Sequence, residues 1–289
     1  MIKDFFQPDT LIGALQLKRD HGGASLLAGG TDLVVAMRHD TFSKDSMIDL
    51  SKVRELKGIV AVRDGIRIGS MTSFTEIEDS ALLQEAADIL CEAVKTVGSP
   101  QIRNRGTIGG NLCNASAAGD GFTPLLCLDA TVELQSLAAD DTVITRILAL
   151  EDFIMGSKKT ALKNNEILTG IIIKRPAAGA LSAFQKIGRR NALAISRLSG
   201  SVILQLENSV VARIHFALGA STSIPERVLA VEEYLTGREL TAEALAEAGK
   251  RASEYVLSQT GTRSSSSYKL PVIEKFTASL INAALEREE

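Results

Sequence analysis

Two glycine pairs, Gly29-Gly30 and Gly109-Gly110, lie about eighty residues apart and constrain the fold of this chain more than any other feature. Each pair is flanked by hydroxyl, amide or carboxylate side chains. Glycine has no Cβ, so a Gly-Gly step turns tightly and lets other groups approach the backbone. Successive backbone N–H groups in such a turn form a concave site for anions. We therefore expect folding to bring the two pairs together around the two phosphates of a dinucleotide.

Composition sets the size of the core and excludes some partners. The chain has 289 residues, enough for two or three domains, and 45% of them are hydrophobic but only 4% aromatic, so the core must be aliphatic. A formal net charge of −3 gives no electrostatic reason to expect nucleic acid as a partner. The N-terminus lacks signal-peptide features and no apolar run could span a bilayer. We expect a cytoplasmic protein without direct membrane insertion.

The reactive side chains are few and scattered. The three cysteines include no CxxC pair, so we expect no metal or iron–sulfur site built by this chain alone. Cys113 is expected to be a small buried residue, because no His or Lys near it in sequence would lower its pKa. The three histidines pair with no Ser or Cys nucleophile, so a hydrolase has no support and no catalytic residue is assigned.

The hydrophobic pattern predicts a mixed architecture. A strand at 25–28, the first glycine pair and a helix at 34–37 form a strand–loop–helix unit, and Asp64-Gly65 marks a hairpin. Residues 72–96 have helical periodicity, the second glycine pair is expected in a loop, and 125–135 is expected to be a strand.

The C-terminal part has a different pattern. Three strands between residues 182 and 218 are expected to form one antiparallel sheet, followed by three helices between 224 and 285. This order predicts α+β domains rather than a doubly wound parallel sheet. We place domain boundaries at 1–55, 56–176 and 177–289.

Known nucleotide motifs are absent, but a family resemblance is present. The sequence contains neither GxxxxGK[ST] nor GxGxxG after a strand. It does contain, in order, LLAGGTDL at 26–33, GSPQIRNRGTIGGN at 98–111, EILTGIII at 166–173 and FQKIGRR at 184–190. In these segments it resembles the FAD-binding medium subunits of the molybdenum hydroxylases, the family of xanthine, carbon monoxide and nicotinate dehydrogenases. The resemblance implies a fold similar to vanillyl-alcohol oxidase, with two α/β FAD-binding subdomains followed by a C-terminal antiparallel sheet with helices.

The resemblance also implies a set of FAD-binding residues. Two segments would wrap the pyrophosphate, and three single residues would lie near the ribityl chain or the flavin ring. These residues are Leu26, Leu27, Ala28, Gly29, Gly30, Thr31, Asp32 and Leu33, then Thr107, Ile108, Gly109, Gly110 and Asn111, and finally Asp120, Leu168 and Lys186. Asp120 would accept hydrogen bonds from ribityl hydroxyls, and the Lys186 cation would stabilise reduced flavin. Leu168 would contact the flavin, although a strand leucine also suits an ordinary core.

The implied function is electron transfer within a complex. Electrons would pass from a molybdenum cofactor on a large subunit, through [2Fe–2S] clusters on a small subunit, to FAD on this chain and then to NAD+ or another acceptor. Two alternatives stay open: a stand-alone FAD-dependent oxidoreductase of the same fold, and an interaction module that has lost FAD. The substrate binds another subunit in this family, so this sequence does not specify it.

Overall fold

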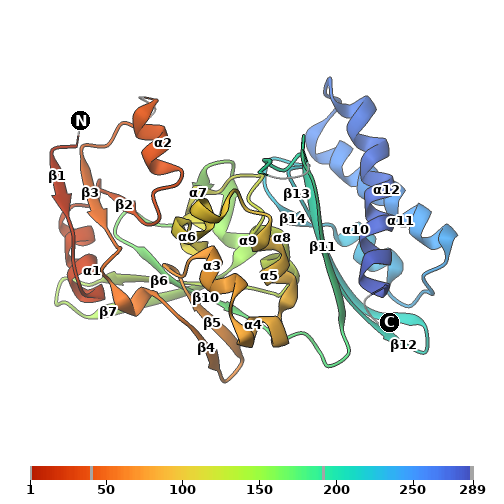
Figure 1. Cartoon of the computed structure of the whole chain (residues 1–289), viewed down its shortest axis with the longest axis horizontal. Coiled ribbons are helices and arrows are strands. Elements are labelled where there is room, and N and C mark those ends of the chain that lie inside the picture. Colours follow the sequence, from red (N-terminus) through yellow and green to blue (C-terminus); the bar gives the residue numbers. More distant parts are fainter. Residues whose placement is uncertain (1, 40–41, 191–192, 287–289) are drawn as a thin grey trace.

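Three main sheets follow one another along the chain in the computed structural model, which describes residues 2–39, 42–190 and 193–286 (Figure 1). Residues 4–49 form the first sheet, 59–173 the second and 181–227 the third. The three units lie in chain order along the long axis of the molecule (Figure 1). Within the described ranges, no helix combines the length and the hydropathy needed to cross a membrane.

The first unit is a small parallel sheet with two helices. Its strands have the order β1-β3-β2. The elements are β1 (Asp4–Phe6), α1 (Leu11–Asp20), β2 (Ser25–Leu27), α2 (Leu33–Arg38) and β3 (Ser46–Asp49). The predicted strand–loop–helix unit around the first glycine pair is thus confirmed. Its core residues Leu15 and Ile48 join one hydrophobic cluster with Leu137 and Ile167 of the second unit, which fixes the two units against each other.

The second unit is a five-stranded antiparallel sheet with the order β4-β5-β10-β6-β7. The strands are β4 (Ile59–Val62), β5 (Gly65–Gly69), β6 (Thr131–Leu137), β7 (Val143–Ala149) and β10 (Ile167–Ile173), with the short pair β8 (Ile154–Gly156) and β9 (Lys159–Thr160). The helices are η1 (Arg54–Leu56), α3 (Phe74–Glu78), α4 (Ala81–Ala86), α5 (Asp88–Lys95), α6 (Pro100–Arg105), α7 (Ile108–Asn114), α8 (Phe122–Cys127) and α9 (Leu150–Phe153). The predicted hairpin is β4–β5.

Two predictions in this unit are wrong in part. The periodic stretch 72–96 is three helices, because two residues interrupt the helical path. Ser80 caps a new helix by accepting a hydrogen bond from the Leu83 amide, and Ala87, with φ of −161° and ψ of 48°, leaves helical geometry before α5. The stretch 125–135 begins as helix α8 and becomes strand β6 only at Thr131. Every residue of α8 is buried, and an apolar run without periodicity does not distinguish a buried helix from a strand.

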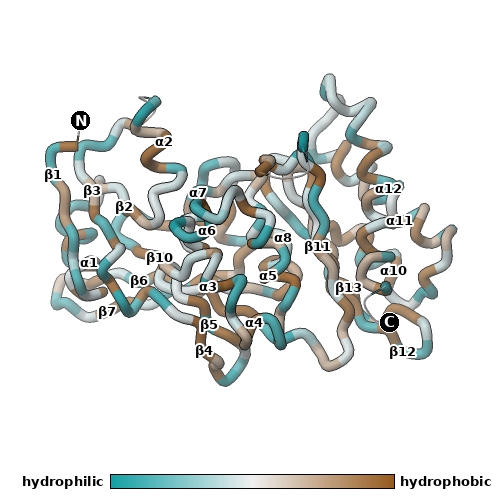
Figure 2. Tube along the Cα trace, in the orientation of Figure 1, coloured by the Kyte–Doolittle hydropathy of each residue, from teal (hydrophilic) through white to brown (hydrophobic). Residues whose placement is uncertain are grey.

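The third unit is an antiparallel sheet covered on both faces. Its strands have the order β11-β12-β13-β14, which are β11 (Leu181–Ile187), β12 (Leu198–Glu207), β13 (Val210–Gly219) and β14 (Glu226–Arg227). One face packs on α10 (Leu229–Leu235) and α12 (Ser266–Leu285), and α11 (Ala242–Thr260) packs against these two helices. The other face packs on α8 of the second unit. Figure 2 shows α11 and α12 alternating between hydrophobic and hydrophilic segments, as expected when one face of each helix is buried.

Helices α11 and α12 are packed closely at Gly249. A Cβ atom at this position would lie 2.4 Å from the carbonyl oxygen of Glu274. We predict that Gly249→Ala lowers the free energy of unfolding by about 1–3 kcal/mol through overpacking, although Ala is the better helix former. Chemical denaturation measures this change, and Gly23→Ala is the control because no heavy atom lies within 4 Å of that position. Equal or higher stability of Gly249→Ala would contradict the packing described.

Candidate functional site

The first glycine pair forms a bend that is packed backbone against backbone. The bend joins the end of β2 to the start of α2, and Gly30 has a φ of +77°, in the left-handed region that favours glycine. A Cβ atom on Gly29 would lie 1.8 Å from the carbonyl oxygen of Arg105. Any other residue at position 29 would therefore push the bend away from the turn between α6 and α7.

The two glycine pairs converge in space. The turn that Gly29 touches comes directly before Thr107, which caps α7. On α7 itself, a Cβ atom at Gly110 would lie 3.6 Å from the Cβ of Ala28. The convergence expected from the sequence is confirmed.

The second pair differs from the expected loop, because it lies in the first turn of α7. The hydroxyl of Thr107 accepts a hydrogen bond from the Gly110 amide at 3.1 Å, and its carbonyl accepts one from Asn111 at 2.9 Å. The Gly109 amide donates to the carbonyl of Ser70, at the end of β5, at 2.9 Å. The expectation that this pair presents free amides is therefore wrong. Its glycines are needed instead for close packing: a Cβ on Gly109 would lie 2.6 Å from the Ser70 carbonyl oxygen.

The first bend supplies the free donors. In the part of the chain that the structure describes, the amides of residues 29–32 donate no hydrogen bond. Asp32 stands at the N-cap of α2, but its side chain does not cap the helix. Consecutive free amides beside a helix start can bind a phosphate or another anion.

A cavity of about 230 Å³ lies against Gly29 and Thr107, between the first two units. Lys57 and Arg105 line it, and neither forms an ion pair with any described residue. Glu76 also lines it, and its Oε2 accepts hydrogen bonds from the amide and hydroxyl of Ser73. Two cations against one carboxylate give the lining an excess of positive charge, which suits a diphosphate.

Sequence reasoning missed these two cations. Arg105 stands inside the second glycine-rich motif, and its place before the glycine pair was an available signal. Lys57 had none, because it lies in a connection far from either motif and only folding brings it to the cavity.

Asn111 has an unsatisfied acceptor. Its side-chain Oδ1 is buried and has no hydrogen-bond partner among the described residues. A Cβ on Gly121 would lie 2.9 Å from this atom, so the segment that contains Asp120 lies beside α7. A buried amide group without a partner marks a place where a bound group with a donor would be stabilised.

Asp120 and Lys186 form a buried ion pair. The ammonium of Lys186 donates to Asp120 Oδ2 at 2.5 Å and to the carbonyl of Thr96 at 3.0 Å. Asp120 Oδ1 accepts from the hydroxyl of Ser196 at 2.5 Å. Burial raises the pKa of the Asp120 carboxyl, whereas the Lys186 charge and the hydrogen bonds from Lys186 and Ser196 oppose this shift. The structure thus joins two predicted site residues that are 66 positions apart.

Leu168 lies in the main hydrophobic core, and Cys113 packs against it. Leu168 lies on β10 with 3% of its surface exposed, in the main hydrophobic cluster. The carbonyl of the next residue, Thr169, accepts a hydrogen bond from the Ser70 amide at 3.1 Å. Because the Ser70 carbonyl accepts from the Gly109 amide, Ser70 links β10 to the start of α7. Cys113 is half-buried rather than fully buried as expected. Loss of hydration still raises the pKa of its thiol to about 12, so this cysteine is not a reactive thiolate.

The other predicted residues lie at the ends of strands and helices or in the first bend. Leu26 and Leu27 end β2, Leu33 begins α2, and Ile108 is fully buried at the start of α7. Thr31 lies within the first bend. All predicted residues therefore lie on connected segments of the first two units, except Lys186, which joins them from the third.

Comparison with family models identifies both parts of the chain. Residues 1–176 match the FAD binding domain in molybdopterin dehydrogenase. Residues 182–284 match the CO dehydrogenase flavoprotein C-terminal domain.

Individual proteins and solved structures are similar over nearly the same length. The nicotinate dehydrogenase FAD-subunit of Eubacterium barkeri is 38% identical over 248 residues, 84% of this chain and 82% of that protein. The xanthine dehydrogenase FAD-binding subunit of Escherichia coli is 30% identical over 278 residues, 96% of this chain and 94% of that protein. A chain of carbon monoxide dehydrogenase from Hydrogenophaga pseudoflava superposes with a TM-score of 0.91 at 26% identity, covering 99% of this chain and 98% of that one.

Removing one partner of the Asp120–Lys186 pair leaves the other charged and buried. We predict that Asp120→Asn and Lys186→Met each lower the free energy of unfolding by about 3–5 kcal/mol. The double variant loses less than the sum of the two, because neither charge is then left alone. Chemical denaturation of all four proteins gives the coupling. Asp45→Asn, which breaks the exposed pair with Lys3, is the control and changes stability little. Additive losses in the double variant would show that the pair is not coupled.

Proposed function

The chain belongs to the FAD-binding medium subunits of the molybdenum hydroxylases, and we propose that it passes electrons from iron–sulfur clusters of a partner subunit, through FAD, to NAD+ or another acceptor. It is thus a subunit of an oxidoreductase. The observation that carries the proposal is the convergence of the two glycine pairs beside a positively charged cavity.

The residues beside this cavity fit the diphosphate of FAD. The free amides of the bend at 29–32 would donate to phosphate oxygens, and Thr31 would add a hydroxyl donor. Lys57 and Arg105 would balance the two negative charges. The second glycine pair would serve mainly by close approach, since its amides are already engaged. Asn111 Oδ1, which lacks a donor, would accept a hydrogen bond from a hydroxyl of FAD rather than from the diphosphate. The close backbone contacts at Gly29 and Gly109 keep the first bend and the start of α7 together around this site.

The Asp120–Lys186 pair supports a role at the flavin end of the site. Lys186 has three N–H donors, of which two are taken by Asp120 and Thr96, so one stays available for a ring carbonyl. Asp120 neutralises most of the Lys186 charge, so Lys186 would contribute a directed hydrogen bond more than an unbalanced cation. The second lone pairs of the Asp120 oxygens would accept from ribityl hydroxyls. When bound, FAD supplies the redox chemistry itself, while these groups position it and limit access of water.

The partners follow from the relatives. Two of them are FAD subunits of nicotinate and xanthine dehydrogenases, and others are medium subunits or chains of dehydrogenase or hydroxylase complexes. We infer that this chain assembles with a small iron–sulfur subunit and a large molybdopterin subunit.

FAD binding can be tested at the second glycine pair. We predict that Gly110→Val weakens FAD binding at least about tenfold, or about 1.4 kcal/mol, because the new methyl groups would crowd Thr107 and Ala28. The flavin absorbance of the purified chain and titration of the apoprotein with FAD measure this effect. Gly23→Val is the matched control and should keep its flavin, because its surroundings are open. Replacing Lys57 and Arg105 by Gln should weaken binding without crowding. Normal flavin content in both Gly110→Val and this double variant would overturn the assigned site.

Assembly and electron flow can be tested on the complex. We predict that the tagged chain, expressed with its neighbouring genes, purifies with two further chains and with iron and molybdenum in stoichiometric amounts. Anaerobic NADH should bleach the flavin absorbance of this complex if NAD+ is the acceptor. A flavin-containing chain that purifies alone and oxidises substrate by itself would favour the stand-alone oxidoreductase. Bleaching by substrate but not by NADH would replace NAD+ with another acceptor.

A further inference from the structure

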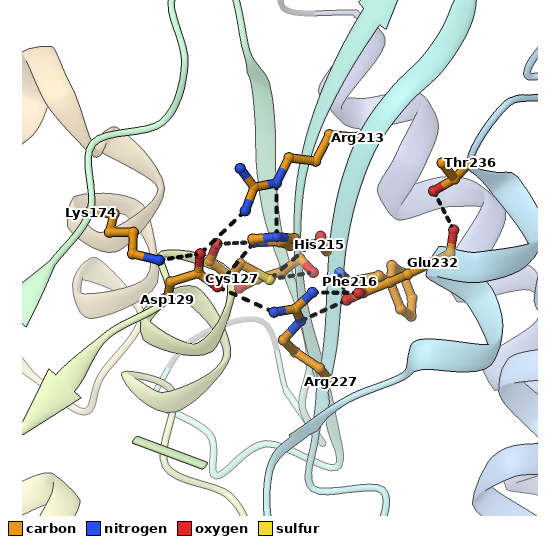
Figure 3. A network of polar contacts seen from close by, with 10 residues as sticks. Cys127, Asp129, Lys174, Arg213, His215, Phe216, Arg227, Glu232 and Thr236 are labelled. Carbon is orange, nitrogen blue, oxygen red and sulfur yellow. Dashed lines mark hydrogen bonds and ion pairs between the residues drawn. The ribbon is translucent and has the colours of Figure 1, made fainter. Parts of the chain in front are cut away.

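A second polar centre surrounds Asp129, at the joint between the second and third units (Figure 3). Asp129 follows α8 and has φ of +48°. Its carboxylate accepts from Lys174 at 3.2 Å, Arg227 at 3.2 Å and Arg213 at 3.4 Å. Lys174 follows β10, whereas the two arginines come from the third sheet, so a single carboxylate holds cations from both units.

Positive charge exceeds negative charge at this centre. Arg227 is also paired with Glu232, through two hydrogen bonds at 2.5 and 2.9 Å. Lys174 and Arg213 have only Asp129 as an acidic partner among the described residues, and their side chains are 67% and 65% exposed. Such exposed pairs are weak, so both cations can bind an added anion at little cost.

The His215 ring orients one of these cations through a hydrogen bond. Its Nδ1 lies 2.7 Å from the carbonyl oxygen of Cys127, which can only accept, so Nδ1 carries the proton. Nε2 is then the acceptor, and it receives a hydrogen bond from Arg213 Nε at 3.2 Å. The terminal nitrogens of Arg213 are thereby left to face Asp129 and the space beside it, as Figure 3 shows.

A pocket of about 80 Å³ opens beside these groups. If a water needs 10–15 Å³ of such volume, the pocket has room for roughly five to eight water-sized atoms. Its lining includes the cations Lys174, Arg175 and Arg213 and the apolar residues Leu128, Ala180 and Ile203. This combination of cationic and apolar side chains is typical of a site for a small amphipathic ligand.

We propose that this pocket binds a small organic anion, with its carboxylate on Arg213 and Lys174 and a short apolar body against Leu128, Ala180 and Ile203. The Asp129 carboxylate stands beside the bound anion and limits its affinity, because it repels a second negative charge. The pocket is too small for a dinucleotide.

The pocket is distinct from the FAD site. Helix α8 separates the two: Asp120 precedes its first residue, and Asp129 follows its end. Six helical residues span about 9 Å. None of the pocket residues lines the cavity at the glycine pairs.

Thermal unfolding of the full FAD-loaded chain tests the proposal. Sodium butyrate serves as the probe, and butyramide, its uncharged isostere, serves as the control, with ionic strength held constant by sodium chloride. We expect butyrate to raise Tm saturably and butyramide to leave it unchanged. The variant with Arg213→Gln and Lys174→Gln should bind butyrate at least about tenfold more weakly. Lys250→Gln, which removes an exposed cation in the middle of α11 that does not line the pocket, should bind it like the unaltered chain.

The flavin absorbance separates this proposal from the assignment of the FAD site. It should be normal in the double variant, because both substituted side chains are distant from the glycine pairs. Equal effects of butyrate and butyramide, or full butyrate binding in the double variant, would overturn the proposed pocket. Stabilisation by inorganic phosphate without any by butyrate would overturn its assignment to an organic anion.

Discussion

The contact between Gly29 and the carbonyl of Arg105 is the constraint on which the candidate site depends. It requires two backbones to approach where a Cβ would lie only 1.8 Å from an oxygen. The contact places the free amides of the first bend next to the start of α7 and beside the cavity that Arg105 and Lys57 line. A similar contact at Gly109 fixes α7 on the end of β5. Backbone packing thus forms the walls of the candidate FAD site, and the side chains around it supply charge.

The Asp120–Lys186 pair gives the third unit a place in this site. Lys186 comes from β11, and Ser196 lies in the segment between β11 and β12, whereas Asp120 and Thr96 belong to the second unit. A buried pair of this kind stabilises little by itself, but removing one member leaves a charge without compensation. It therefore specifies how the third unit meets the second. Asp129 connects the same two units at the other end of α8, through the exposed Lys174 and Arg213 and the mostly buried Arg227.

Local patterns predicted the elements whose signals are independent of their surroundings. The bend at Gly29-Gly30, the hairpin at Asp64-Gly65, three strands of the C-terminal sheet and the helices after it follow from glycine positions and periodicity. The helix expected from residue 224 begins only at Leu229, because Glu226–Arg227 forms a fourth strand, β14. The prediction was wrong where the same sequence pattern is compatible with two kinds of secondary structure. Helix α8 is apolar on every side, and the second glycine pair lies in a helix because Thr107 caps it. The domain boundaries at 55 and 176, and the role of each residue toward FAD, stay predictions.

By itself, the sequence determined which backbone positions lack a side chain, where strands and helices alternate, and which family the motifs resemble. These properties are local, because they depend on residues near one another in the chain. Only the tertiary structure decided that Lys57 and Arg105 reach the cavity, that Lys186 is neutralised by Asp120, and that the amides of the second glycine pair are occupied. Each of these depends on contacts between distant segments, and a hydrogen bond or charge pair is set by distance in space rather than by order along the chain.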